Sequence, residues 1–283
     1  MYRLSSYQMV ALLFAAVLIA VGVSGALISA VKGHYPGVVL SAWATTTPTI
    51  DGTITPGEWD DADTMTFTIG GHDGAIYVKN DATNLYIAVV ITDDDDSDDA
   101  LRISFNDDHD NNAPENGEDA IKFDQITNDF YDLYYDATDY NYYNDEDAGG
   151  SQDGSAASTK TGTVPNIVHV FEFSHPLDSA DDDHDFDLSI GDTVGFVVCY
   201  WDYGVMVAAV AANFYTWPGS WTEAEGYGDI IIASPPSPPL TPVGGAPRQI
   251  NWRSVAVHFA WQLGPAIALL MAALVLLTVR RRP

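Results

Sequence analysis

Acidic residues are confined to one part of this chain, and that confinement limits what the chain can fold into. All forty Asp and Glu residues lie between Asp51 and Asp229, where only four residues are Lys or Arg, so the segment carries a formal charge of −36. Long apolar segments flank it on both sides. This layout predicts a membrane-tethered domain outside the cell that repels nucleic acid and anionic lipid and attracts cations. An adaptation of the surface to high salt or acid is the alternative reading of the same charge.

The two apolar flanks predict membrane segments. Residues 1–31 contain an uncharged run from Met9 onward that could cross a bilayer core, and we interpret them as a signal peptide or an N-terminal anchor, with cleavage favoured. Residues 255–279 form a second apolar run that continues directly into Arg280-Arg281-Arg282. The positive-inside tendency therefore predicts a transmembrane helix over 255–279 with a short cytoplasmic tail at 280–283. The expected location is the cell membrane, with a single pass and an extracellular domain.

A proline-rich stretch precedes the second apolar run. Residues 234–250 lose charge and gain proline, which favours an extended spacer between the domain and the membrane. Cys199 is the only cysteine, so no intramolecular disulfide can stabilise the domain, and we interpret this residue as a small core side chain.

The acidic region itself has an all-β pattern. Short runs rich in β-branched and aromatic residues alternate with Asp, Asn and Gly turns, so we expect one β domain over residues 45–233. A segment dominated by Asn, Asp, Gly and Ser, residues 136–160, is expected to be a long loop. The expected strands are 66–69, 75–79, 85–92, 101–105, 120–123, 131–135, 167–174, 193–201 and 229–233.

Motifs near both ends of this domain resemble a known family. They are Ile50-Asp51-Gly52, Glu58-Trp59-Asp60-Asp61-Ala62, Asn84-Leu85-Tyr86, the run from Asp187 to Phe196, and Gly226-Tyr227-Gly228-Asp229. Together they are similar to the family 9 carbohydrate-binding-module superfamily, which includes DOMON-like domains. The resemblance implies an antiparallel β-sandwich of jelly-roll-like type that binds carbohydrate. From the residues alone, Trp59 lies at helical spacing from Ala62 on a short corner segment and is expected in the core.

A calcium site is expected in the loop after the fourth expected strand. Asp108, Asp110 and Asn112 alternate as the oxygen ligands of a calcium loop do, and Glu118 and Asp119 follow near the distal position. Ala113 stands where an EF-hand needs glycine, so we predict a calcium-binding β-loop and no EF-hand. A solvated acidic turn is the alternative.

Aromatic residues are the candidates for ligand binding. Sugar C–H faces stack on indole rings while nearby carboxylates accept hydroxyl hydrogen bonds, and Trp201, Asp202, Trp217 and Trp221 offer both groups. Trp217 and Trp221 could form a clamp similar to the paired tryptophans of sugar-binding family members. The alternative is that these rings close the edge of the sandwich.

No catalytic motif is present, so we expect a binding protein and no enzyme. The leading hypothesis is a membrane-anchored extracellular carbohydrate-binding module stabilised by calcium, with a cell-surface glycan as partner. The alternative is a structural or adhesive surface protein whose self-association depends on calcium. A third hypothesis, a redox subunit that holds haem without a covalent bond, would use two of Met65, Met206, His72, His169 and His175 as axial ligands.

Overall fold

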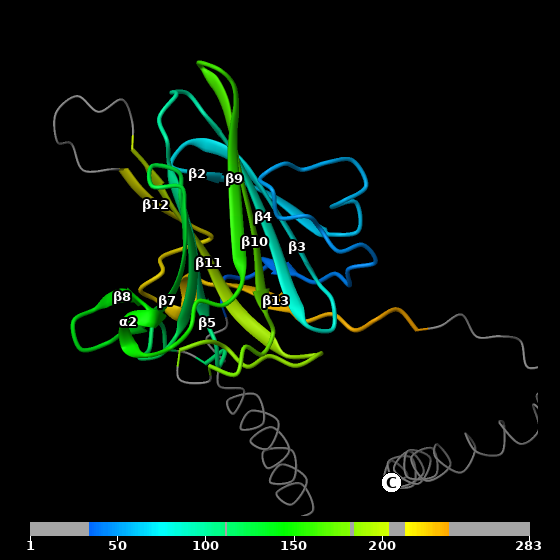
Figure 1. Ribbon diagram of the computed structural model, residues 1–283, viewed down its shortest axis with the longest axis vertical. Helices are drawn as coiled ribbons and strands as arrows, with labels where there is room; N and C mark the ends of the chain where they lie inside the picture. Colours follow the sequence, from blue (N-terminus) through cyan, green and yellow to red (C-terminus); the bar gives the residue numbers. More distant parts are fainter. Residues whose placement is uncertain (1–33, 111, 182–183, 204–212, 238–283) are drawn as a thin grey trace, which may run out of the picture. The chain divides into compact units, whose positions relative to one another are not determined.

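Two β-sheets face each other in the computed structural model, which describes residues 34–110, 112–181, 184–203 and 213–237 (Figure 1). The larger sheet has eight strands. In spatial order they are β1 (Val39–Leu40), β13 (Gly228–Ile231), β11 (Thr193–Asp202), β5 (Ala100–Asn106), β6 (Asp119–Asp124), β7 (Asp129–Asp136) and β8 (Asn141–Asn144), with β12 (Asn213–Trp217) paired to β11. The smaller sheet has the order β2 (Asp63–Ile69), β3 (His72–Asn80), β4 (Asn84–Asp93), β10 (Asn166–Pro176) and β9 (Ser155–Thr163).

Every strand pair is antiparallel except β1 with β13, so the predicted antiparallel β-sandwich is confirmed. In the described residues, helical structure is limited to α2 (Asp145–Ala148), beside β7 and β8, and the short helix η1 (Ala224–Gly226) (Figure 1). Among residues 34–237, apart from the undescribed gaps, we find no helix with the length and apolar character to cross a membrane. The expected segments 1–31, 255–279 and 280–283 and most of the 234–250 spacer lie outside the described residues.

The core between the sheets follows the two-residue period of the strands. On β5 the odd-numbered residues Leu101, Ile103 and Phe105 are fully buried in it, and on β11 the even-numbered Phe196, Val198 and Tyr200 are buried beside them. The intervening side chains therefore point to the outer face of the larger sheet. The same alternation places the odd-numbered residues of β10 in the core, including Phe171 and Phe173.

A second apolar cluster covers the outer face of the smaller sheet. Trp59 is 3% exposed and packs with Tyr86 and Ala88, which confirms its expected core position. Its indole Nε1 donates a hydrogen bond of 2.8 Å to Glu172 on β10. The turn at Gly52 lies directly against β9, because a Cβ added at this glycine would be 2.6 Å from the carbonyl carbon of Ser158. Its φ of +81° also favours glycine at this position. The Ile-Asp-Gly motif thus belongs to a segment that is held against the outer face of this sheet. We call residues 51–59 of this segment the strap.

All nine expected strands are present, and four further strands were not expected. The segment 136–160, expected to be a long loop, instead contains β8, α2 and the beginning of β9. The sequence of β9, Ser-Ala-Ala-Ser-Thr-Lys-Thr-Gly-Thr, has little apolar character because it is an edge strand whose side chains stay half-buried or exposed. β9 is held in place by its pairing with β10. At the other end of the domain, β1 pairs with β13, so the sandwich begins before residue 45, its expected start.

Candidate functional site

The outer face of the larger sheet carries a group of aromatic rings around one arginine. The guanidinium carbon of Arg102 on β5 lies 3.9 Å from the ring centre of Tyr142, 5.3 Å from that of Trp201 and 5.2 Å from that of Trp221. Arg102 is only 7% exposed, so it holds the rings from beneath by cation–π contacts. We call Arg102, Tyr142, Trp201 and Trp221 the arginine-centred aromatic cluster.

This cluster continues along the sheet. Lys122 is the register partner of Arg102, and its ammonium nitrogen lies 5.4 Å from the Trp201 ring centre and 3.1 Å from a carboxylate oxygen of Asp124. Phe214 on β12, which is 39% exposed, packs against Trp201 with ring centres 4.8 Å apart. Trp201 and Trp221 themselves are half-buried. The face therefore presents aromatic surface next to charged groups, a combination that suits sugar recognition.

The structure does not bring the two proposed clamp residues together. Trp217 points to the opposite side of the larger sheet, where it stacks on Phe67 of the core with ring centres 4.4 Å apart, whereas Trp221 packs on the outer face. The reason is that Trp217 ends β12 in an inward position, and three residues, Pro218, Gly219 and Ser220, separate it from Trp221. Asp202 follows the last outward residue of β11, and its Oδ2 lies 3.6 Å from His72. Trp201 and Trp221 remain as the pair that shares one face.

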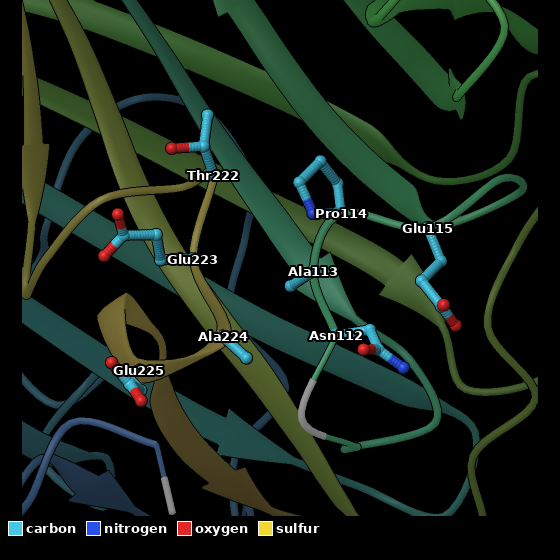
Figure 2. Close-up of a pocket in the computed structure, with 8 residues that line it drawn as sticks. All are labelled: Asn112, Ala113, Pro114, Glu115, Thr222, Glu223, Ala224 and Glu225. Carbon is cyan, nitrogen blue, oxygen red and sulfur yellow. The ribbon is translucent and has the colours of Figure 1, made fainter. Parts of the chain in front are cut away.

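A surface depression of about 600 Å³ adjoins this region. Residues 112–115 form one of its walls and residues 222–225 form the other (Figure 2). No aromatic ring lines it, and three of its eight lining residues are Glu115, Glu223 and Glu225. Its chemistry suits cations or hydroxyl donors better than a stacked sugar ring.

The residues of the expected calcium loop divide into separate environments. Asp108 and Asp110 stay at the surface, where carboxylate oxygens from both lie within 4.8 Å of each other and of one from Glu115. The side chain of Asn112 donates to Asp110 over 2.9 Å. Glu118 turns inward, and burial raises its pKa to about 9. Asp119 begins β6 and points into the sandwich.

Asp119 lies among residues that the sequence analysis did not group with it. One oxygen each from Asp119, Asp132 and Asp185 and a ring nitrogen of His175 all lie within 4.8 Å of one another, and all four residues are buried. The sequence did contain a signal, because His175 continues the inward-facing series of β10. A titratable side chain at the end of such a series faces the interior and needs polar partners there.

A second buried polar group lies at the other end of β10. The hydroxyl of Tyr200 is hydrogen-bonded to both Asp93, at 2.7 Å, and Asp99. The Tyr200 hydroxyl has only one proton and can donate to only one of these carboxyl groups. The second hydrogen bond therefore needs a proton on the other carboxyl group, which donates to the hydroxyl oxygen. Burial raises the pKa of Asp99 to about 7, and repulsion by Asp93 adds to the rise. His169 Nδ1 is bonded to Gln125, so this group is a shared-proton network in which most polar atoms have partners.

Asp99→Asn should therefore change how stability depends on pH. The pKa of Asp99 in the folded protein, about 7, exceeds its ordinary value of 3.8. The protonated carboxyl of Asp99 therefore contributes fully to the free energy of unfolding below about pH 4, and this contribution is lost as the pH rises through 7. Asparagine imitates the protonated carboxyl. We expect the variant to gain about 1 kcal/mol or more relative to the wild type between pH 4 and pH 8, measured by denaturant unfolding. Asp94→Asn at the exposed neighbouring position is the control, and equal pH curves for wild type and Asp99→Asn would contradict the prediction.

Histidines proposed as haem ligands occupy these two separate groups. His169 and His175 are six residues apart on one extended strand, which places them roughly 20 Å from each other. Each has buried carboxylates within 4.0 Å. Met206 lies outside the described residues.

Comparisons with known proteins give structural likeness only. No protein-family model matches the chain. The curated proteins contain no match either. The similar solved structures include two family 9 carbohydrate-binding modules from Caldicellulosiruptor kristjanssonii. One is in complex with cellotriose, with 10% identity, a TM-score of 0.47 and coverage of 74% of this chain and 99% of that one. The other is in complex with glucose, with 11% identity, a TM-score of 0.48 and coverage of 71% and 98%.

A third similar structure is a putative carbohydrate-binding protein from Bacteroides uniformis, with 8% identity, a TM-score of 0.44 and coverage of 68% of this chain and 96% of that one. At these identities and TM-scores the likeness assigns no ligand to this chain. Over its described residues the chain is a β-sandwich of two sheets.

Proposed function

We propose that this protein is a membrane-anchored extracellular carbohydrate-binding module that binds its glycan over the arginine-centred aromatic cluster and is stabilised by calcium. The observation that carries the proposal is that Trp201 and Trp221 flank one guanidinium on the same outer face. Cation–π contacts fix both rings before a ligand arrives, so little side-chain entropy is lost on binding. The membrane anchor rests on the apolar run at 255–279 and the arginines that follow it.

Calcium in this proposal binds the surface loop after β5. Asp108, Asp110 and Glu115 converge there, and hard carboxylate oxygens are the ligands that calcium prefers. Main-chain carbonyls and water would complete the six to eight oxygens that the ion takes. The loop borders the depression in Figure 2 through Asn112 and Glu115, so a bound ion would also order one wall of that depression.

The test is a glycan array with the full chain in detergent, probed in millimolar calcium and again in chelator. For a glycan that binds, Trp201→Ala and Trp221→Ala should each weaken affinity by about tenfold, because each removes one stacking contact. Tyr77→Ala is the matched control, since Tyr77 is a half-buried ring on the outer face of the opposite sheet. Asp108→Asn should weaken binding only when calcium is limiting.

The outcomes separate the candidate functions. If both tryptophan variants keep wild-type affinity, the glycan site lies elsewhere. If no glycan binds in either condition, the structural or adhesive alternative gains support, and light scattering with and without calcium would then test self-association. Melting curves for each variant establish that the protein is folded before its affinity is compared.

A further inference from the structure

Four carboxylates and one imidazole meet in the interior of the sandwich, at one end of its apolar core. They come from both sheets and from the connections between strands. The residues are Asp119 on β6, Asp132 on β7, Asp145 on α2, His175 on β10 and Asp185 in the segment after β10. All are at most 6% exposed. We call these five residues the His175 cluster.

Most of the polar atoms in the His175 cluster have no hydrogen-bond partner. Both carboxylate oxygens of Asp119, of Asp145 and of Asp185 are unpartnered and buried, as is Oδ1 of Asp132. Burying an ionised oxygen without a partner costs several kcal/mol, and here seven such oxygens share one site. A cation among these oxygens would offset that cost.

The imidazole of His175 is aimed into the same space. Its Nδ1 lies 2.8 Å from the carbonyl oxygen of Pro176, so Nδ1 carries the proton and donates it there. Nε2 is buried and has no hydrogen-bond partner, and in the neutral tautomer it carries the lone pair that a metal ion would bind. It lies 3.5 Å from Asp132 Oδ1, 3.8 Å from Asp185 Oδ2 and 3.9 Å from Asp119 Oδ2. A histidine oriented by a carbonyl through one nitrogen, with the other nitrogen free, is the usual state of a metal ligand.

No Lys or Arg side chain of the described residues neutralises these acids. Lys79, Lys122 and Lys160 are paired with other carboxylates, and Arg102 lies on the outer face of the sheet. A bound cation would supply the positive charge that the described side chains do not bring to these acids.

We propose that the His175 cluster binds a divalent first-row transition-metal ion through Nε2 of His175 and carboxylate oxygens of Asp119, Asp132 and Asp185, with Asp145 beside them. Calcium prefers an all-oxygen set, whereas an imidazole nitrogen among carboxylates suits manganese, iron or zinc. The site is separate from the surface loop at Asp108, and its occupation does not depend on glycan binding. Phe186 packs against His175 with ring centres 4.7 Å apart and shields the imidazole on its apolar side.

A route for the ion is present. A depression of about 590 Å³ opens at the surface beside the cluster, and its lining includes Asp107, Asp108, Glu118 and Asp185. Asp185 thus lines the depression and belongs to the cluster. Carboxylates along this route attract a cation from solution.

The first experiment measures metal on the full chain in detergent. Elemental analysis of protein purified without chelator should find about one transition-metal ion per chain, and chelation should lower the melting temperature. Titrating the chelated protein with Co²⁺ should restore the melting temperature and give the visible absorption bands of a protein-bound cobalt ion. His175→Gln should weaken Co²⁺ binding by at least about tenfold. His184→Gln is the control and should leave Co²⁺ binding unchanged, because His184 is paired with Asp181, which is outside the cluster.

A second readout does not depend on whether the variant folds. Pulsed EPR of wild-type protein loaded with Mn²⁺ should detect one directly coordinated imidazole nitrogen. The proposal is overturned if that nitrogen signal is absent, if calcium competes with Co²⁺ at equal concentration, or if no dication alters the melting temperature of the chelated chain. The first two results would indicate an oxygen-only calcium site, and the third would indicate a proton-sharing cluster without metal.

Discussion

Lys79→Met should lower the free energy of unfolding by about 3 kcal/mol, because it removes one partner of a buried charged network. The Lys79 side chain is fully buried, and its ammonium group donates to the carbonyl oxygens of Thr46, at 2.7 Å, and Glu58, at 2.5 Å, and to Asp61 at 2.8 Å. Methionine keeps most of the apolar volume but leaves the carboxylate of Asp61 and two carbonyls without their donor. Denaturant unfolding monitored by tryptophan fluorescence would measure the loss.

Lys160→Met is the matched control for this prediction. Lys160 also contacts two acids, Asp96 and Asp98, but it is partly exposed and the acids are 69% and 54% exposed. Exposed ion pairs contribute at most about 1 kcal/mol, so this variant should remain close to wild type. Equal losses in the two variants would mean that burial of the Lys79 network has no special role in stability.

Glu172→Gln should destabilise the protein by about 2 to 3 kcal/mol, although it changes the shape of the side chain very little. One carboxylate oxygen of Glu172 accepts from the backbone N–H groups of Asp51, Gly52 and Thr53 at 3.1, 2.8 and 3.2 Å, and the other accepts from Trp59 Nε1 at 2.8 Å. Glutamine offers only one acceptor oxygen, so its NH₂ group must face either the indole or the turn. Donors would then meet donors in a buried site.

The effect should be local to the strap at residues 51–59. Hydrogen exchange of its backbone amides should increase in Glu172→Gln, and thermal or denaturant unfolding would give the size of the loss. Trp59→Phe removes only the indole donor and should cost about 1 kcal/mol plus the smaller packed area. Glu146→Gln at an exposed position of α2 is the charge control. An unchanged exchange rate in Glu172→Gln would show that the carboxylate does not hold the strap.

The sheets of this protein were predictable because their signal is local. Short runs rich in β-branched and aromatic residues, bounded by Asp, Asn and Gly turns, marked all nine expected strands, because such residues favour a strand whatever it pairs with. The strands that escaped prediction, such as β8 and β9, have polar sequences and are stabilised by hydrogen bonds to β7 and β10. Edge pairing of this kind depends on a partner far along the chain, which a local window cannot reveal.

The candidate sites depended much more on the tertiary structure. Trp201 and Trp221 were identified from sequence as ring-bearing residues, but only the inward turn of Trp217 and the position of Arg102 show which rings share a face. The acidic loop after β5 was also visible in the sequence. That Asp119 leaves this loop to face His175 is a consequence of its being the first inward residue of β6.

The sequence by itself determined that this chain has an acidic, disulfide-free β domain between apolar segments, because charge, cysteine content and two-residue periodicity need no knowledge of distant contacts. Only the tertiary structure decided that five residues, spread over 67 positions from Asp119 to Asp185, converge on one buried site. The physical reason is that a sandwich brings together strands that are distant in sequence. Which acids meet inside it is set by the pairing and facing of the sheets, and forty similar carboxylates give the sequence no means to distinguish them.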